Sequence, residues 1–495
     1  MEKVTKKDLK LALTFNDVLL VPSKSNILPR DVDVSSRLTD NIILQTPILS
    51  AAMDTVTENA MAIAMAREGG LGVLHKNMSI ERQCIEVERV KRSESGVIID
   101  PVTIAPDKSV RDAVSIMRNR SISGLPVIDD ENQLVGILTE RDIRFEENLD
   151  QPVSAVMTSK KLVTAPKGTT LEDARKILQK KRIEKLLIVE QDGTLCGLVT
   201  VKDLLMKQRF PHATLDLHGR LRVAAAIGAT DDVLDRVAGL VDAGVDVLVL
   251  DSAHGHSTGV LDAVKNVKKG YGSIPLIAGN VATADGTRDL IDRGADVVKV
   301  GIGAGASCTT RIIAGIGVPQ LTAILDSIDV AKKSGISVVS DGGVRYSGDI
   351  AKAIAAGADN VMLGSLLAGL DESPGESILR EGRQYKSFRG MGSMGPMSEG
   401  SADRYFQAGE KSIKLVPEGV EGMVPYRGSV RSNLYQLIGG LRASMGYCGS
   451  HNIQEMQNKT QFIRITSSAS IESHPHDMQI LKESPNYQVK NRLKD

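Results

Sequence analysis

The 495-residue chain has no tryptophan, and aromatic residues make up only 3% of it. So few aromatic side chains leave little surface on which unpaired nucleic-acid bases could stack. The formal net charge is zero, because 61 basic side chains balance 61 acidic ones. No overall charge attracts such a chain to nucleic acid or to an anionic membrane. We therefore expect neither as a partner.

Long apolar runs and clustered cysteines are also missing. No stretch approaches the roughly 18–20 apolar residues that span a bilayer, and the charged N-terminus MEKVTKKDLKLALTF does not have the pattern of a signal peptide. The cysteines are scattered without the spacing of metal ligands: Cys84, Cys196, Cys308 and Cys448. These features predict a cytoplasmic protein with reduced thiols.

An internal repeat is one of the features that the chain does have. Residues 105–142 and 165–203 both begin with Ala-Pro, contain an Asp-Ala pair and end in G-x-x-T-x-x-D. Self-similarity at a fixed offset indicates two stacked copies of one supersecondary unit. In each copy the pattern predicts a short strand, a helix, and two strands around a turn.

Outside residues 94–208 the pattern changes to short β-branched runs that end in small or polar residues. These runs are PILSAAMD (47–54), GLGVLHKN (70–77), RVAAAIG (222–228), VDVLVLDSAHG (245–255), PLIAGN (275–280), ADVVKVGIG (295–303), SVVSDGG (337–343) and NVMLGS (360–365). Buried parallel strands that alternate with helical patterns predict an α/β fold, a (β/α)8 TIM barrel. A doubly wound sheet would have fewer strands and an early glycine fingerprint.

The loops after strands seven and eight of such a barrel commonly bind phosphate. Here they contain Gly342, Gly343, Gly364 and Ser365, whose backbone N–H groups can hold an anion. Asp341, at the end of strand seven, can accept hydrogen bonds from the hydroxyl pair of a sugar. Together these loops predict a phosphorylated ribose as part of the ligand.

The loop after strand six, VGIGAGASCTTR (300–311), carries the most reactive side chain of the predicted site. Cys308 lies at the start of a predicted helix, where the helix dipole and Arg311 favour the thiolate. A thiolate beside a phosphate site is a candidate covalent nucleophile. The glycines also fit a dinucleotide fingerprint, although a barrel strand is the wrong context for one. We interpret His254 and His256 as polar loop residues near a ligand, because no carboxylate or cysteine accompanies them at metal-ligand spacing.

Longer motifs carry a resemblance over essentially the whole chain. Besides the loop around Cys308 they are SAAMDTVTE (50–58), SDGGVRYSGD (340–349), FRGMGSMGPM (388–397), SADRYF (401–406), VPEGVEG (416–422) and ESHPHD (472–477). In these motifs the chain resembles the bacterial-type inosine-5′-monophosphate (IMP) dehydrogenases, and its repeat resembles the CBS module. The resemblance implies a catalytic barrel from residues 1–93 and 209–495, with a mobile flap at about 382–430, and an inserted tandem CBS (Bateman) domain at 94–208, with repeats at about 94–148 and 153–208.

The resemblance also implies a reaction. IMP would be oxidised by NAD to xanthosine 5′-monophosphate, the committed step of guanine nucleotide biosynthesis. Cys308 would attack C2 of the purine to give a covalent thioimidate, and Thr310 would help to position and deprotonate water. Arg404, beside Tyr405, would serve as the base of hydrolysis on the flap that replaces NADH.

Ligand contacts and assembly follow from the same resemblance. IMP would contact Ser307, Asp341, Gly342, Gly343, Gly364, Ser365, Phe388, Gly390, Met391, Gly392 and Glu418. NAD would contact Asp251, Ser252, Asn280, Gly301 and Gly303. K⁺ would bind carbonyls of Gly303, Gly305 and Cys308, completed by Glu472, Ser473 and His474 of a neighbouring subunit. That arrangement implies a homotetramer, with an octamer as an alternative through the CBS modules. Adenine or guanine nucleotides would bind those modules, with Asp142 and Asp203 holding ribose hydroxyls.

The chain departs from the family pattern around the predicted phosphate site. In the loop that usually reads G-P-G-S-I-C, Ala304, Ala306 and Ser307 fill the variable places, and Phe388 stands where tyrosine is common. The hydroxyls absent at positions 306 and 388 are usual phosphate contacts, so we expect weaker binding of IMP.

Two other functions compete with this interpretation. Guanosine monophosphate (GMP) reductases share the barrel and the cysteine loop, but ordinarily lack the CBS insert and the Arg-Tyr flap. A nucleotide sensor with a decayed catalytic site would explain the repeat and the missing hydroxyls, but not the intact Cys308, Thr310 and Arg404. Formation of NADH from IMP distinguishes an IMP dehydrogenase from both.

Overall fold

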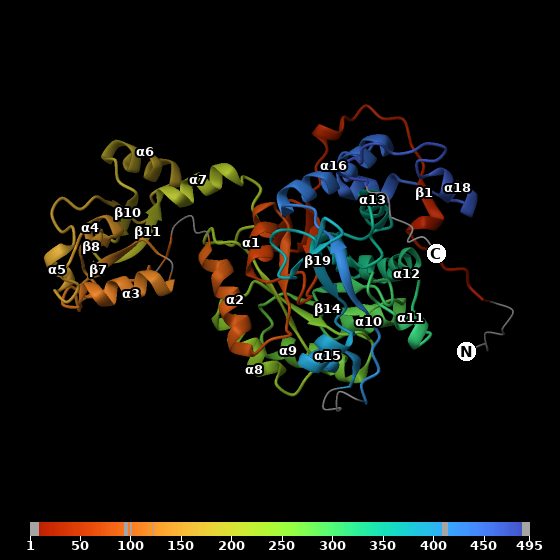
Figure 1. Cartoon of the computed structure of the whole chain (residues 1–495), viewed down its shortest axis with the longest axis horizontal. Coiled ribbons are helices and arrows are strands. Elements are labelled where there is room, and N and C mark those ends of the chain that lie inside the picture. Colours follow the sequence, from red (N-terminus) through yellow and green to blue (C-terminus); the bar gives the residue numbers. More distant parts are fainter. Residues whose placement is uncertain (1–8, 94–97, 100, 121, 408–413, 488–495) are drawn as a thin grey trace. The chain divides into compact units, whose positions relative to one another are not determined.

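The computed structural model describes residues 9–93, 98–99, 101–120, 122–407 and 414–487. The chain divides into two compact units. The barrel unit consists of Met1–Lys91, His212–Thr214 and Leu221–Asp495, and the inserted unit of Arg92–Pro211 and Leu215–Arg220. Figure 1 shows the helices and strands of both units.

Eight parallel strands close into a barrel in the order β12-β13-β14-β15-β16-β17-β4-β5. They are β4 (Ile48–Ser50), β5 (Leu71–Leu74), β12 (Ala224–Ile227), β13 (Val247–Asp251), β14 (Leu276–Val281), β15 (Val297–Val300), β16 (Ser337–Asp341) and β17 (Asn360–Leu363). Each strand overlaps one of the runs identified in the sequence. The predicted (β/α)8 barrel is therefore confirmed.

Helices cover the outside of the barrel because one face of each is apolar. In α8, for example, Val233, Val237 and Leu240 recur at helical spacing and are buried. The main helices of this unit are α1 (Asn59–Arg67), α2 (Ile80–Ser93), α8 (Val233–Asp242), α9 (Thr258–Gly270), α10 (Ala284–Asp292), α12 (Gln320–Lys333), α13 (Ser347–Ala355) and α16 (Val430–Cys448). Inside the barrel, side chains from alternate strand positions, such as Val249 and Val339, form one apolar cluster.

A three-stranded antiparallel sheet leaves the barrel between β17 and α16 and provides part of the site. It consists of β18 (Ser377–Arg380), β19 (Arg383–Arg389) and β20 (Glu421–Pro425). Between β19 and β20 lie α15 (Met394–Glu399) and the 3₁₀ helix η3 (Ser401–Tyr405). Short helices α11 (Thr310–Ile313) and α14 (Ser365–Ala368) follow β15 and β17.

The remaining elements of the barrel unit are short. β1 (Val18–Leu20) pairs with β21 (Phe462–Arg464), and β2 (Ser36–Thr39) pairs with β3 (Ile42–Leu44). The other helices are η1 (Phe15–Asp17), η2 (Pro29–Asp31), α17 (Ile453–Lys459) and α18 (Ser467–Glu472).

The inserted unit shows the same order of elements in its two copies. In the first, α3 (Val110–Arg120) precedes the antiparallel pair β7 (Gly124–Ile128) and β8 (Leu134–Thr139). In the second, β9 (Thr164–Pro166) and α6 (Leu171–Lys181) precede the pair β10 (Lys185–Val189) and β11 (Leu195–Thr200). The predicted first strand of the first copy is reduced to a single bridge at Ile104. The other elements are β6 (Ile98–Ile99), α4 (Glu140–Ile143), α5 (Val153–Val156) and α7 (Val201–Arg209).

Each copy has its own apolar cluster. Leu125 and Leu138 belong to the first cluster, and Leu186 and Val199 to the second. In the described part of both units, no helix combines the length and the apolar character needed to cross a bilayer.

Candidate active site

A cavity of about 470 Å³ lies at the carboxyl ends of the barrel strands. Every residue that we expected to act in catalysis or to contact IMP or NAD lines it, as does Gly305 of the expected cation site. Glu472, Ser473 and His474 do not belong to this lining and are exposed at the end of α18. A cavity of this size can enclose much of a small nucleotide.

The loop that carries Cys308 is held by the segment between α15 and β20. The Cys308 thiol donates a hydrogen bond to Thr310 Oγ1, with Sγ and Oγ1 3.1 Å apart. The Thr309 N–H donates to the Glu418 carbonyl at 2.8 Å, and Cys308 forms an isolated antiparallel bridge with Gly419. The loop around Cys308 is therefore held by a segment more than a hundred residues away in the sequence.

The predicted phosphate loops have the backbone that such a site needs. Gly342 and Gly343 have φ angles of +93° and +80°, a conformation in which a side chain is strained. A Cβ atom on Gly342 would also lie 3.2 Å from the Ala304 backbone, so the loops after β15 and β16 pack closely. Gly364 and Ser365 enter α14 on the same cavity. Backbone N–H groups can thus approach an anion without obstruction from side chains.

Arg311 does not take the place expected from the sequence. Its guanidinium donates to the Val318 carbonyl at 2.7 Å, and its stem lies against Gly303 and Gly317. Arg311 therefore contacts Gly303, Gly317 and Val318, and not the Cys308 thiol as we expected.

A buried lysine joins three of the predicted ligand residues. Lys299 of β15 is only 1% exposed, and its Nζ lies 2.8 Å from Asp251 Oδ1 and 3.1 Å from Asp341 Oδ2. It also donates to Asn280 Oδ1. The Asn280 amide in turn donates to Asp341 Oδ2 at 2.9 Å and to the Gly301 carbonyl at 2.7 Å. One ammonium thus fixes side chains from three neighbouring strands.

Lys299 is one residue of the site that our sequence analysis missed. A signal for it was present, because a lysine in the apolar strand VVKV (297–300) must find a polar partner if the strand is buried. Its partners could not be named from the sequence, since they come from β13, β14 and β16.

Arg404 and Tyr405 of η3 reach the same cavity from above the barrel. The Arg404 guanidinium forms an ion pair with Asp251, and the Arg404 carbonyl accepts from the Ala253 N–H at 3.1 Å. Burial lowers the pKa of Arg404 from its usual value and raises the pKa of Tyr405. The Tyr405 ring lies over Gly392, where an added Cβ would be 2.5 Å from Cζ. Arg404 is therefore held in the cavity by its contacts with Asp251 and Ala253.

The two loop histidines have different surroundings. His256 Nε2 lies 2.7 Å from Asp289 Oδ2, whereas burial lowers the pKa of His254. Neither lines the main cavity. Within the described ranges, no group of three or more metal-ligating side chains is assembled.

Known proteins resemble the chain over nearly its full length. Residues 12–476 match the family model described as the IMP dehydrogenase / GMP reductase domain. Inosine-5′-monophosphate dehydrogenase of Halalkalibacterium halodurans is 58% identical, covering 97% of this chain and 98% of the relative. The Aquifex aeolicus enzyme of the same name is 56% identical, covering 99% and 100%.

A solved structure is similar as well. It is that of a cysteine-to-alanine variant of Trypanosoma brucei GMP reductase in complex with guanosine 5′-monophosphate. It superimposes with a TM-score of 0.87 and 41% identity, and covers 96% of this chain and 99% of that one. Such coverage includes most of the inserted unit, so the insert does not separate the two activities as we expected from the sequence.

Proposed function

We propose an activity for this chain from one premise: the chain belongs to the IMP dehydrogenase / GMP reductase family. The activity is that of an IMP dehydrogenase, an NAD-dependent oxidoreductase that converts IMP, NAD and water to xanthosine 5′-monophosphate, NADH and a proton. The observation that carries it is the 3.1 Å contact between Cys308 and Thr310 in a cavity that Arg404 also lines.

The first half of the reaction belongs to Cys308. Its sulfur, as the thiolate, forms a bond to C2 of the purine, and the hydride leaves that carbon. When bound, NAD accepts this hydride. The product on the enzyme is a thioimidate that joins Sγ to C2. The cavity admits a flat purine here because Ala304, Gly305 and Ala306 present little bulk.

The second half is hydrolysis. Water attacks C2, Thr310 positions it, and neutral Arg404 with Tyr405 beside it takes its proton. The C–S bond then breaks and Cys308 is released. An arginine is ordinarily charged, and the ion pair with Asp251 favours that form. Burial acts in the opposite direction, because it lowers the pKa of Arg404 and so favours the neutral base. The effect of burial on the pKa supports the role of Arg404 as the general base.

IMP is positioned by the residues around the rest of the cavity. Asp341, fixed by Lys299, accepts from the ribose hydroxyls, and Gly343, Gly364 and Ser365 present N–H groups to the phosphate. The purine lies near Met391, Gly392 and Glu418. The remaining expected contacts are Ser307, Gly342, Phe388 and Gly390.

NAD would be held where the main cavity adjoins a second one of about 220 Å³. Asp251, Ser252 and Arg404 line both cavities, and an extended ligand could continue from one into the other once Arg404 moves away from Asp251. Asn280, Gly301 and Gly303 line only the main cavity. This shared boundary fits a dinucleotide better than a mononucleotide.

The Cys308 loop also suits K⁺. Among the described residues, no hydrogen bond reaches the carbonyls of Gly303 and Cys308, so their oxygens are available as ligands for a hard cation. The Gly305 carbonyl already accepts from the Cys308 N–H at 3.1 Å. Since Glu472, Ser473 and His474 lie away from this loop in their own subunit, completion by a neighbouring subunit of a homotetramer is consistent with their exposure.

The inserted unit is proposed to bind adenine or guanine nucleotides and to support octamers. Asp142 Oδ2 accepts hydrogen bonds from the backbone N–H and the hydroxyl of Thr139, and Oδ1 accepts from the Thr158 hydroxyl at 3.3 Å, so a ribose would have to compete with these partners. The Asp203 side chain lies outside the described residues. The free thiols of the described cysteines agree with a cytoplasmic location.

GMP reduction is the second candidate, because the similar solved structure is a GMP reductase. The sequence SADRYF argues against it, since it places Arg404, the proposed base of hydrolysis, in the cavity. The test is to incubate the protein with IMP and NAD, with and without K⁺, and separately with GMP and NADPH. We expect NADH in the first mixture and no oxidation of NADPH in the second; the reverse pattern would identify a reductase.

A further inference from the structure

A second buried ion pair lies beside Arg404 and has no part in the mechanism above. Lys76, in the loop between β5 and α2, places Nζ 2.5 Å from both carboxylate oxygens of Asp403. Their side chains are only 11% and 13% exposed. Burial lowers the pKa of Lys76, and the charge and hydrogen bond of Asp403 oppose that effect. The Asp403 carboxylate therefore stabilises the charged form of the buried Lys76 side chain.

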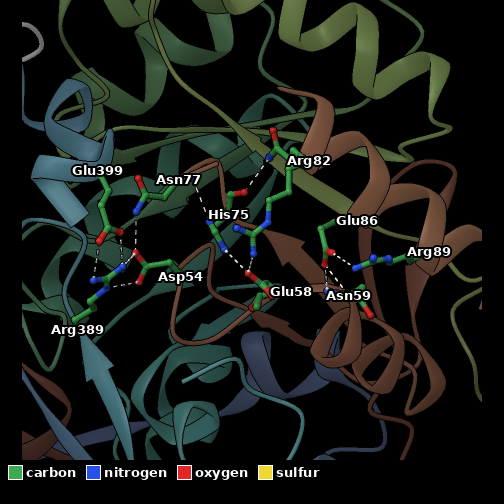
Figure 2. Close-up of polar contacts among 12 residues, drawn as sticks. Asp54, Glu58, Asn59, His75, Asn77, Arg82, Glu86, Arg89, Arg389 and Glu399 are labelled. Atoms are coloured by element: carbon green, nitrogen blue, oxygen red, sulfur yellow. Dashed lines mark hydrogen bonds and ion pairs between the residues drawn. The ribbon is translucent and has the colours of Figure 1, made fainter. Parts of the chain in front are cut away.

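The loop that carries Lys76 is fixed on both sides, as Figure 2 shows for its neighbours. His75 Nε2 lies 3.4 Å from Glu58 Oε1, and its Nδ1 accepts from the Asn77 N–H. The Asn77 amide donates to Asp54 at 2.9 Å. The backbone of Lys76 is therefore held in place, and it would not move with Asp403 if Asp403 were displaced.

The start of the segment that carries Asp403 is connected to the Lys76 loop through Asp54, which also accepts the hydrogen bond from Asn77. Arg389, at the end of β19, donates to Asp54 Oδ2 at 2.9 Å and to Glu399 Oε2 at 2.6 Å (Figure 2). Glu399 ends α15, directly before η3. These contacts hold the residues just before η3. The ion pair with Lys76 holds Asp403, which is within η3.

Space for the pair is provided by Gly228, which follows β12. An added Cβ there would lie 2.6 Å from Asp403 Oδ2 and 3.3 Å from Lys76 Nζ. Asp403 Oδ1 also accepts from the Arg404 N–H at 2.7 Å. A shift of the Asp403 carboxylate would therefore be transmitted directly to the backbone of Arg404.

We propose that Lys76 is a positioning residue that holds Arg404 against Asp251 through its ion pair with Asp403. This inference rests on the proposed function, in which Arg404 acts in hydrolysis and not in hydride transfer. Loss of the pair should therefore slow the second half-reaction selectively. Misplacement of a catalytic group by about 1 Å can cost on the order of a hundredfold in rate.

The experiment compares Lys76→Met with Lys91→Met by rapid mixing with IMP and NAD. Lys91 pairs with Asp246 at 2.8 Å and its side chain is 4% exposed, so it is also a buried, paired lysine, but it belongs to α2 outside the cavity. For Lys76→Met we expect an NADH burst of unchanged amplitude and rate, followed by a steady state slowed about tenfold to a hundredfold. Lys91→Met should change neither phase by more than about twofold, as expected for a substitution remote from the site.

A second readout separates positioning from general weakening of the fold. If Arg404 is displaced from Asp251, NAD should rebind to the covalent intermediate more easily, so inhibition by excess NAD should begin at lower concentrations. Gly228→Ala should also slow the steady state, because the added methyl group would displace the Asp403 carboxylate. In a double-mutant cycle, Asp403→Asn should add little to Lys76→Met, because both remove the same ion pair.

The outcomes are distinguishable from failure of the proposed function. Absence of NADH with the unaltered protein would overturn the activity itself. A normal steady state in Lys76→Met, or equal slowing of burst and steady state, would overturn the positioning role. Additive effects of Lys76→Met and Asp403→Asn would also contradict it.

Discussion

The barrel unit and the inserted unit differ in what they bury. Among the described residues, every buried polar or charged side chain lies in the barrel unit, and the inserted unit buries only apolar side chains and backbone. Several of its ion pairs are exposed, as in Arg111–Asp150, whose side chains are 62% and 75% exposed, whereas Asp216, which pairs with Arg220, has a side chain that is 9% exposed. Burying polar groups costs free energy unless they are paired.

The free-energy cost of burying polar groups therefore falls on the barrel unit. Lys299, Asp251 and Asn280 occupy positions that apolar side chains could fill, and their pairing fixes groups in the cavity. The inserted unit contains no such cluster in its described part, and the cores of its two copies are apolar. The predictions below test this division of roles.

The largest effect is expected from Cys308→Ala. Loss of the nucleophile should lower kcat by more than about a thousandfold, while IMP still binds, because the phosphate and ribose contacts remain. Turnover is measured as NADH formation and binding by calorimetry. Cys448→Ala, in α16 outside the cavity, is the matched control and should retain activity. If Cys308→Ala still formed NADH at a normal rate, the covalent mechanism would be wrong.

Arg404→Gln should give the next largest effect. Hydrolysis should slow by about a hundredfold to ten-thousandfold, the usual contribution of a general base, so one equivalent of NADH forms and the reaction stalls. Because burial lowers the pKa of Arg404, its neutral fraction and the hydrolysis rate of the unaltered protein should rise with pH. The variant should lose that rise. Disappearance of the burst itself would show that Arg404 acts before hydrolysis.

A smaller effect is expected where hydroxyls are missing. A hydrogen bond to a charged group contributes roughly 1.5–3 kcal/mol, and each 1.4 kcal/mol is about tenfold in affinity. Ala306→Ser and Phe388→Tyr, which both line the cavity, should therefore lower KM for IMP by about tenfold or more when combined. Phosphate stays bound throughout the reaction, so kcat should hardly change. An unchanged KM in steady-state assays of the double variant would refute this assignment.

The smallest effect on catalysis should follow removal of the inserted unit. Replacing residues 92–211 by a short flexible linker should leave kcat/KM within about twofold, because the cavity is lined only by the barrel unit. Effects of ATP and GTP on activity or oligomer size should vanish at the same time. Kinetics and light scattering of both proteins check this. If neither nucleotide affects the full-length chain, the regulatory role is wrong.

Local patterns predicted the fold and most of the candidate site. Eight β-branched runs were sufficient for the barrel, because buried parallel strands are apolar along their length. The order of those strands then placed Cys308 and the loops at Gly342 and Gly364 around one cavity. The family resemblance added Arg404 and its neighbours, which no local pattern had indicated.

By itself, then, the sequence determined the strands, their order and the loops that carry chemistry, because these depend on residues that are near one another along the chain. Only the tertiary structure decided which buried charged side chains pair with one another. Lys299 meets Asp251 and Asp341 because the strands that carry them lie near one another in the barrel wall. Lys76 meets Asp403 across 327 residues because η3 docks over the loop after β5. Such contacts depend on how elements close in space, which no local pattern encodes.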